Sequence, residues 1–151
     1  MIYSFTSEAM PARLAVGGPR DQRGGRFSPD GRWFVYSSNE TGRAEIYVQP
    51  YPELDRKYPV SVDGGIDPAW SRDSETIFYL SDGVMMAADI TAEPEFSAGT
   101  PRELFRGQYE IDPWEDQSYG VFPDGDFAMI QRKPGSLRMR VITNFAASLP
   151  Q

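Results

Sequence analysis

The stretch Ser28-Pro29-Asp30-Gly31-Arg32-Trp33-Phe34-Val35-Tyr36-Ser37-Ser38 decides the fold, because it occurs three times along the chain. The second copy runs from Ser71 to Ser81 and the third from Phe122 to Ile130. The shared aspartates stand 43 and then 51 residues apart, at Asp30, Asp73 and Asp124. Each copy reads as a type I turn that reverses the chain into a strand rich in aromatic and aliphatic residues.

A strand-and-turn repeat of this length is typical of β-propeller blades. We therefore expect an all-β fold of about three four-stranded antiparallel blades, which is half of a six-bladed ring. The blades are expected at 26–62, 67–106 and 118–144. They lie within a single domain that spans 1–151 and ends in a short tail at 145–151, where 144–149 is a short helix candidate.

The strand count predicts how such a half-ring is completed. The third blade lacks an outer strand, whereas 12–16 precedes the first blade as an orphan strand. We expect this N-terminal strand to complete the last blade of a partner copy, which makes the protein a homodimer with one six-bladed ring. A fragment of a longer chain whose other blades close the ring is the alternative.

The three turns differ in their residues. The first has Pro29, Asp30 and Gly31, and the third has Pro123, Asp124 and Gly125. In the second turn Asp73 is kept, but Arg72 replaces proline and Ser74 replaces glycine. Proline and glycine suit the second and fourth positions of this turn, so the second copy is expected to have the weakest turn.

Composition excludes several classes of function. The formal net charge of −7 argues against nucleic acid as a partner and against docking on anionic membranes. The absence of cysteine and histidine excludes disulfides, thiol nucleophiles, Ser-His-Asp catalysis and the common zinc sites. We expect no cofactor, no bound metal, no membrane insertion and no enzymatic activity. The sequence as written predicts a cytoplasmic protein, or a periplasmic or extracellular one if it is a fragment.

The order and spacing of three longer stretches resemble a known family. They are 27–48, 64–74 and 96–105, the first of which reads FSPDGRWFVYSSNETGRAEIYV. They resemble TolB-like propellers, whose repeat is also called the WD40-like or PD40 repeat, and in particular the C-terminal blades of bacterial kinase-associated propellers. The resemblance implies a propeller fold and a role as a binding module, and it implies no catalytic residues.

The segment from Glu110 to Asp116 is the main candidate site, because it gathers four carboxylates and a tryptophan between the second and third blades. Its ligand-binding candidates are Asp112, Trp114, Glu115 and Asp116. They could bind Ca²⁺ or a cationic peptide, and the alternative is a solvated acidic loop. The connection that ends at Gly25 adds Arg23 and Arg26, but it lacks the residues of a phosphate-binding loop.

The remaining polar and aromatic repeats are better explained by structure. Asp30, Asp73 and Asp124 are expected to serve their turns rather than a metal, and Trp33 and Trp70 are expected in the core. We therefore favour a non-catalytic binding or scaffold module for a protein or peptide ligand. The alternatives are a metal-assisted hydrolase with a carboxylate-lined channel mouth, or a remnant of a longer sensor.

Overall fold

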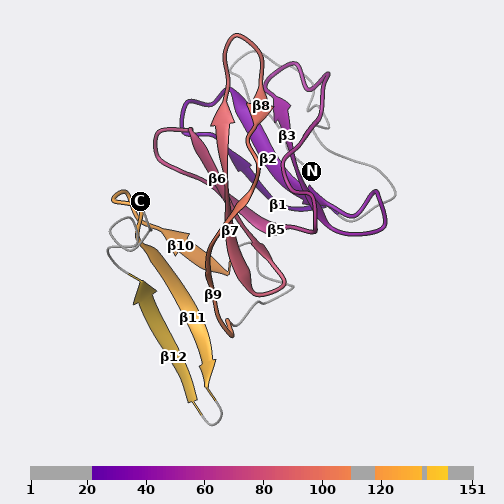
Figure 1. Ribbon diagram of the computed structural model, residues 1–151. Coiled ribbons are helices and arrows are strands. Elements are labelled where there is room, and N and C mark those ends of the chain that lie inside the picture. The colour runs from indigo at the N-terminus through magenta and orange to yellow at the C-terminus, as the bar shows by residue number, and fades with distance from the viewer. Residues whose placement is uncertain (1–21, 110–117, 134–135, 143–151) are drawn as a thin grey trace, which may run out of the picture.

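The computed structural model describes residues 22–109, 118–133 and 136–142, and these form twelve strands in three antiparallel sheets (Figure 1). The described residues contain no helix, so the chain is an all-β protein of blade-type sheets. None of the described segments forms an apolar helix long enough to cross a bilayer.

Each sheet follows the chain order, with neighbouring strands joined by hairpins. Blade one consists of β1 (Gln22–Phe27), β2 (Trp33–Ser38), β3 (Glu45–Pro50) and β4 (Tyr58–Pro59). Blade two consists of β5 (Ile66–Trp70), β6 (Thr76–Ser81), β7 (Val84–Thr91) and β9 (Arg102–Arg106), and the short β8 (Ser97–Ala98) pairs with the far end of β7. Blade three contains β10 (Tyr119–Val121), β11 (Phe127–Lys133) and β12 (Ser136–Ile142).

The strands β2, β6 and β11 each follow one of the three repeated turns, as the sequence predicts. The strand β4 comprises only two residues, and beyond it the backbone N–H of Ile46 bonds to the Ser61 hydroxyl, 2.8 Å away. The strand β8 was not expected. The orphan strand 12–16 and the helix candidate 144–149 lie outside the described residues.

Two of the three repeated turns close with the same hydrogen bonds. The Ser28 hydroxyl donates to Asp30 at 2.5 Å and accepts from the Trp33 N–H at 3.0 Å. Ser71 donates to Asp73 at 2.6 Å and accepts from the Thr76 N–H at 2.9 Å. The third turn begins with Phe122, which has no hydroxyl, and its backbone closure onto Asp126 is one residue shorter. The serine hydroxyl bonds are thus limited to the first two turns, whereas the third keeps a bond from the Asp126 N–H to the Asp124 carboxylate at 3.3 Å.

We predict that Ser74→Gly stabilises the protein by about 1 kcal/mol, because Ser74 holds a left-handed backbone conformation with φ +65° that glycine adopts without strain. Gly31 holds the same place in the first turn with φ +72°, and open space surrounds the position of its missing Cβ. Gly31→Ser is therefore the matched control and should lower stability by a similar amount. Urea unfolding midpoints measure both, and shifts in the same direction would contradict this account.

Among the described residues, the core includes two clusters that each lie at a junction between blades, and a third within blade one. The first joins Val35, Ile46 and Val48 of blade one to Ile77 and Tyr79 of blade two. The second joins blade two to blade three through Ala69, Leu80, Met85, Tyr119, Phe127 and Met129. Because side chains alternate along a strand, β6 presents Ile77 and Tyr79 to blade one and Leu80 to blade three. Burial on both faces of the central sheet is what holds successive blades together.

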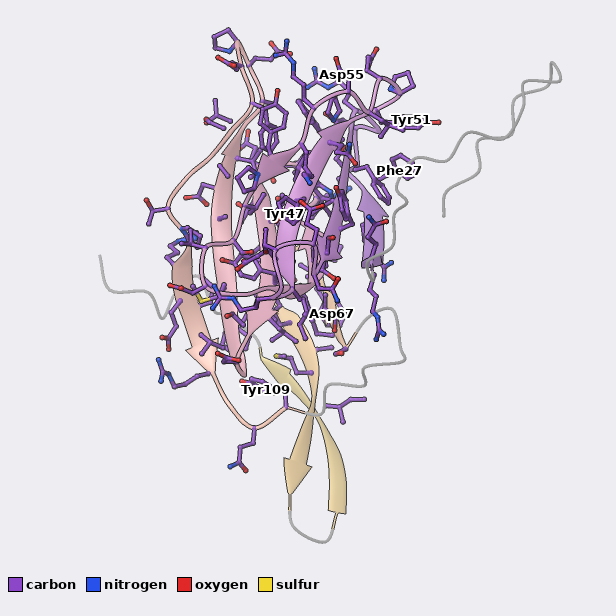
Figure 2. All side chains as sticks on the ribbon, turned by 90° about the vertical axis from the view of Figure 1, so that its right-hand side faces the viewer. Phe27, Tyr47, Tyr51, Asp55, Asp67 and Tyr109 are labelled. Atoms are coloured by element: carbon purple, nitrogen blue, oxygen red, sulfur yellow. The ribbon has the colours of Figure 1, made fainter. Side chains whose placement is uncertain are left out.

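The first strands of the blades also contact one another across the junctions. Both β1 and β5 carry a bulge with a residue of positive φ, Gly24 in β1 and Asp67 in β5. A Cβ at Gly24 would lie only 3.1 Å from Pro68, so the two strands approach closely here. Asp67 in turn accepts hydrogen bonds from Ser118 at 2.5 and 3.2 Å (Asp67 is labelled in Figure 2). The bulge position, which is Gly24 in blade one and Asp67 in blade two, thus contacts the following blade at both junctions.

A buried carboxylate fixes the connection between blades one and two. Glu45, at the start of β3, accepts hydrogen bonds from the Gly64 N–H at 3.0 Å, from the Ser61 hydroxyl and from the Arg43 guanidinium at 2.9 Å. The nearby phenol of Tyr79 is affected by this cluster: burial, helped by the charges of Glu45 and Asp63, raises the pKa of Tyr79 to about 12. Glu45 therefore anchors the 61–64 segment that leads into β5.

Candidate functional site: the turn cleft

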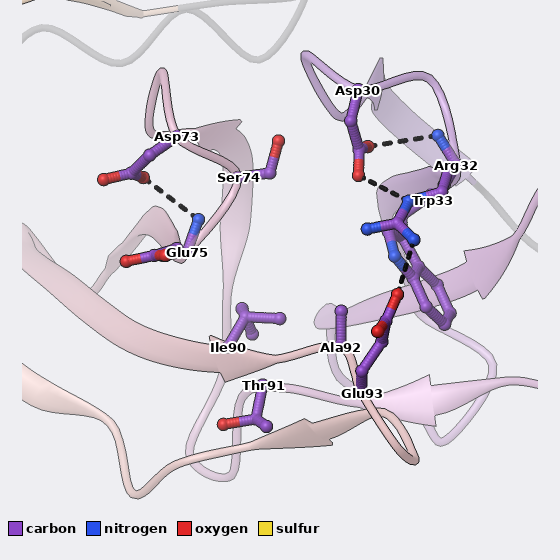
Figure 3. A pocket seen from close by; sticks show the side chains of 10 residues that line it. All are labelled: Asp30, Arg32, Trp33, Asp73, Ser74, Glu75, Ile90, Thr91, Ala92 and Glu93. Atoms are coloured by element: carbon purple, nitrogen blue, oxygen red, sulfur yellow. Dashed lines mark hydrogen bonds and ion pairs between the residues drawn. The ribbon is translucent and has the colours of Figure 1, made fainter.

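A cavity of about 450 Å³ lies between the first two repeated turns, and we call it the turn cleft. One wall is the turn that carries Asp30 and Arg32, and the opposite wall is the turn with Asp73, Ser74 and Glu75 (Figure 3). The end of β7 and the loop after it add the remaining lining, which is Ile90, Thr91, Ala92 and Glu93. Trp33 completes the cleft on the Arg32 side.

Charge in the turn cleft is unevenly distributed. The guanidinium of Arg32 forms ion pairs with Asp30 at 2.8 Å and with Glu93 at 2.9 Å, so it joins blade one to the β7–β8 loop. On the other wall, Asp73 and Glu75 form no ion pair with a cation within the described part of the chain. Four carboxylates and a single guanidinium thus line the cleft, and the uncompensated pair of carboxylates lies on the wall of blade two.

The pKa values of the two turn aspartates favour their ionised forms. Burial alone would raise the pKa of Asp30, but hydrogen bonds from Ser28 and Arg32 outweigh it and lower this pKa below its usual value. The Ser71 hydroxyl and the Glu75 N–H, which bond to the Asp73 carboxylate, lower the pKa of that group. Both aspartates therefore carry charge throughout the neutral and mildly acidic range.

Trp33 gives the turn cleft an aromatic component. Its ring packs against Phe96, with centroids 4.6 Å apart, and against Tyr58 at 6.2 Å. Its buried indole N–H has no hydrogen-bond partner among the described residues. Trp33 thus belongs partly to the core, as expected, but it also lines the cleft. Trp70 is buried in the first cluster.

The other predicted site residues lie elsewhere. Asp112, Trp114, Glu115 and Asp116 are outside the described residues. Arg26 is on β1 and donates to the Gly25 carbonyl at 3.0 Å, while the Arg23 carbonyl accepts from Ser37 at 3.3 Å. Neither arginine lines the turn cleft. Within the described ranges, no group of three or more acidic side chains is placed to hold a metal ion.

The cleft is a different place from the candidate site that the sequence indicates. That candidate lies in the connection between the second and third blades, outside the described residues. The cleft instead lies where β1 and β5 end and their turns begin. The sequence does contain one indication of the cleft: each turn has a charged residue two places after its aspartate, at Arg32, Glu75 and Asp126. No sequence pattern indicates that Glu93 belongs to the cleft.

Comparison with known proteins finds structural neighbours but no sequence relatives. No protein-family model matches the chain, and no curated protein sequence matches it. Among solved structures, the chain is similar to an oligogalacturonate lyase from Vibrio parahaemolyticus, with 15% identity and a TM-score of 0.47. That match covers 69% of this chain and 27% of the lyase, so the chain spans about a quarter of the length of that protein. Lyase activity is a property of that protein, and the assignment of blade-type sheets rests on the strand pairing described above.

Proposed function

We propose that this chain is a non-catalytic binding module whose turn cleft receives a cationic group of a protein or peptide ligand. The observation that carries the proposal is the cavity between the two turns, which is lined on one side by Asp73, Ser74 and Glu75 and on the other by Arg32 and Trp33. Carboxylates attract an ammonium or guanidinium group, and an indole face adds a cation–π contact.

The charges around the cleft support this ligand class. Arg32 already neutralises part of Asp30 and Glu93, which leaves the blade-two wall for an incoming cation. The formal net charge of −7 adds a long-range attraction for basic partners. The metal-assisted hydrolase considered from the sequence depends on Asp112, Glu115 and Asp116, and nothing among the described residues favours it.

We predict that removing the two charges of the blade-two wall weakens binding of a labelled Arg-Gly-Arg-Gly-Arg peptide about fivefold. The variant is Asp73→Asn with Glu75→Gln, since asparagine keeps an acceptor for the Ser71 hydroxyl and preserves the turn. Exposed charge pairs contribute about 0.5 kcal/mol each, so two pairs give about 1 kcal/mol, or about fivefold in the dissociation constant. Fluorescence anisotropy measures the dissociation constant, and an Asp-Gly-Asp-Gly-Asp peptide should not bind.

The matched control is Asp124→Asn with Asp126→Asn, which makes the same change of charge in the third turn, away from the cleft. It should leave the affinity unchanged. Because hydrogen bonds lower the pKa of Asp73, its charge and its contribution to binding should persist as the pH falls to the usual pKa of an aspartate, about 4, and be lost only below it. Equal weakening in both double variants would show that general charge, and not the cleft, attracts the peptide.

A further inference from the structure

The first two repeated turns hold their aspartates in the same way. One oxygen of the Asp30 carboxylate accepts hydrogen bonds from the serine hydroxyl two places before it, at 2.5 Å, and from the backbone N–H two places after it, at 3.1 Å. One oxygen of the Asp73 carboxylate accepts from the same two positions of its own turn, at 2.6 and 3.0 Å. The two carboxylates are therefore equivalent parts of the repeat, and their surroundings can be compared directly.

In the first turn, the chain itself supplies a guanidinium to this carboxylate. Arg32 stands two places after Asp30, and its Nε donates to the other oxygen of that carboxylate at 2.8 Å. A terminal nitrogen of the same guanidinium donates to Glu93 at 2.9 Å (Figure 3). One guanidinium thus bridges two of the carboxylates that line the turn cleft.

In the second turn, the corresponding position has the opposite charge. Glu75 stands where Arg32 stands in the first turn, so a second carboxylate accompanies Asp73 in place of a guanidinium. Both acidic groups line the turn cleft, and neither pairs with a cationic side chain in the portions of the chain that the structure describes. The second turn therefore has two carboxylates, as such a bridge requires, and lacks the guanidinium.

We infer that the cationic group received by the turn cleft is the guanidinium of an arginine, and that it bridges Asp73 and Glu75 in the way that Arg32 bridges two carboxylates beside the first turn. This inference rests on the proposed function and names the side chain that the cleft prefers. A planar guanidinium holds its N–H donors in a fixed fork that can bond to two carboxylates, whereas the compact ammonium of lysine is strongly hydrated. Arg32 thus acts as an internal copy of the ligand group.

The first test compares two labelled peptides of equal charge, Arg-Gly-Arg-Gly-Arg and Lys-Gly-Lys-Gly-Lys, by fluorescence anisotropy. The arginine peptide should bind about threefold more tightly, because the fork adds directed hydrogen bonds to the charge that both peptides share. This preference should disappear in Asp73→Asn with Glu75→Gln. It should persist in Asp124→Asn with Asp126→Asn, which alters the third turn, outside the cleft.

The second test uses Glu75→Arg, which recreates the first-turn pattern of an aspartate followed two places later by an arginine. The new guanidinium should pair with Asp73 and weaken binding of the arginine peptide about tenfold, whereas Glu75→Gln removes only a charge and should weaken it about twofold. The matched control Asp126→Arg makes the same change of charge at the same place in the third turn. It should leave the affinity nearly unchanged.

The outcomes distinguish this inference from the proposed function. Equal affinities for the two peptides, or a Glu75→Arg effect no larger than that of Glu75→Gln, would show that the cleft receives cations without selecting a guanidinium. No binding of the arginine peptide to the unaltered protein would overturn the proposed function and this inference together. Glu75 is exposed, so all variants should keep their β-sheet circular dichroism. If Glu75→Arg alone loses it, the comparison of the two peptides decides.

Discussion

Phe127→Ala should lower the free energy of unfolding by about 4 kcal/mol, the largest loss that we expect from a single substitution in this chain. Phe127 is 1% exposed and crosses the junction between blades two and three. Its ring packs edge-on against Phe78 at 5.0 Å and against Phe105 at 5.4 Å, and both partners belong to blade two. Truncation to alanine removes both contacts and leaves a cavity that two rigid sheets cannot easily fill.

Amide hydrogen exchange shows which strands lose stability in Phe127→Ala. The amides of β10 and β11 should exchange much faster in Phe127→Ala, whereas those of β2 and β3 should keep most of their protection. Phe122→Ala is the matched control, because it makes the same chemical change on the same blade at a ring that is 44% exposed. It should cost no more than about 0.5 kcal/mol. Similar losses for the two variants would show that the junction does not depend on Phe127.

Glu45→Ala should cost about 3 kcal/mol, because it removes the acceptor for several donors at once. The Gly64 N–H and the Ser61 hydroxyl would lose their carboxylate partner in a place that water reaches poorly, and Arg43 would lose its closest ion pair. Breaking a buried charged network by removing one member is costly, because the remaining groups stay desolvated. Urea unfolding followed by circular dichroism measures the change.

Two further variants separate burial from charge at this position. Glu45→Gln keeps an acceptor oxygen and should restore part of the lost stability. Asp63→Ala removes a second carboxylate that faces Arg43 at 3.5 Å, but this side chain is exposed, so the cost should stay below about 0.5 kcal/mol. A loss for Asp63→Ala as large as that for Glu45→Ala would indicate that attraction to Arg43, and not the buried hydrogen bonds, stabilises the segment.

Much of the fold could be predicted because its signals are local. The turn at Ser28 to Trp33 and its copy at Ser71 are specified by adjacent residues, and the strands that follow them alternate in a regular way. The weakness expected of the second turn is visible as the positive φ of Ser74, although the side-chain bonds of that turn are complete. Local chemistry of this kind needs no knowledge of the tertiary structure.

The features that escaped prediction depend on segments far apart in the sequence. The turn cleft needs Glu93 to reach Arg32, 61 positions away, and no short motif encodes that contact. Glu45 looks like an ordinary strand residue until the Ser61 and Gly64 segment folds over it. Side-chain partners chosen across blades are set by how the sheets pack, which a repeat pattern does not reveal.

The loop between β7 and β8 can change in sequence without disturbing the sheet of blade two. Residues 92–96 leave β7 and return as β8, so the wall that carries Glu93 is held at its base by strand pairing and by the buried ring of Phe96. The exposed part of this loop lies outside the sheet. Its length and sequence are therefore free to vary without cost to the blade. Changes in this loop, in nature or by design, would therefore alter the ligand preference of the cleft while the sheets stay the same.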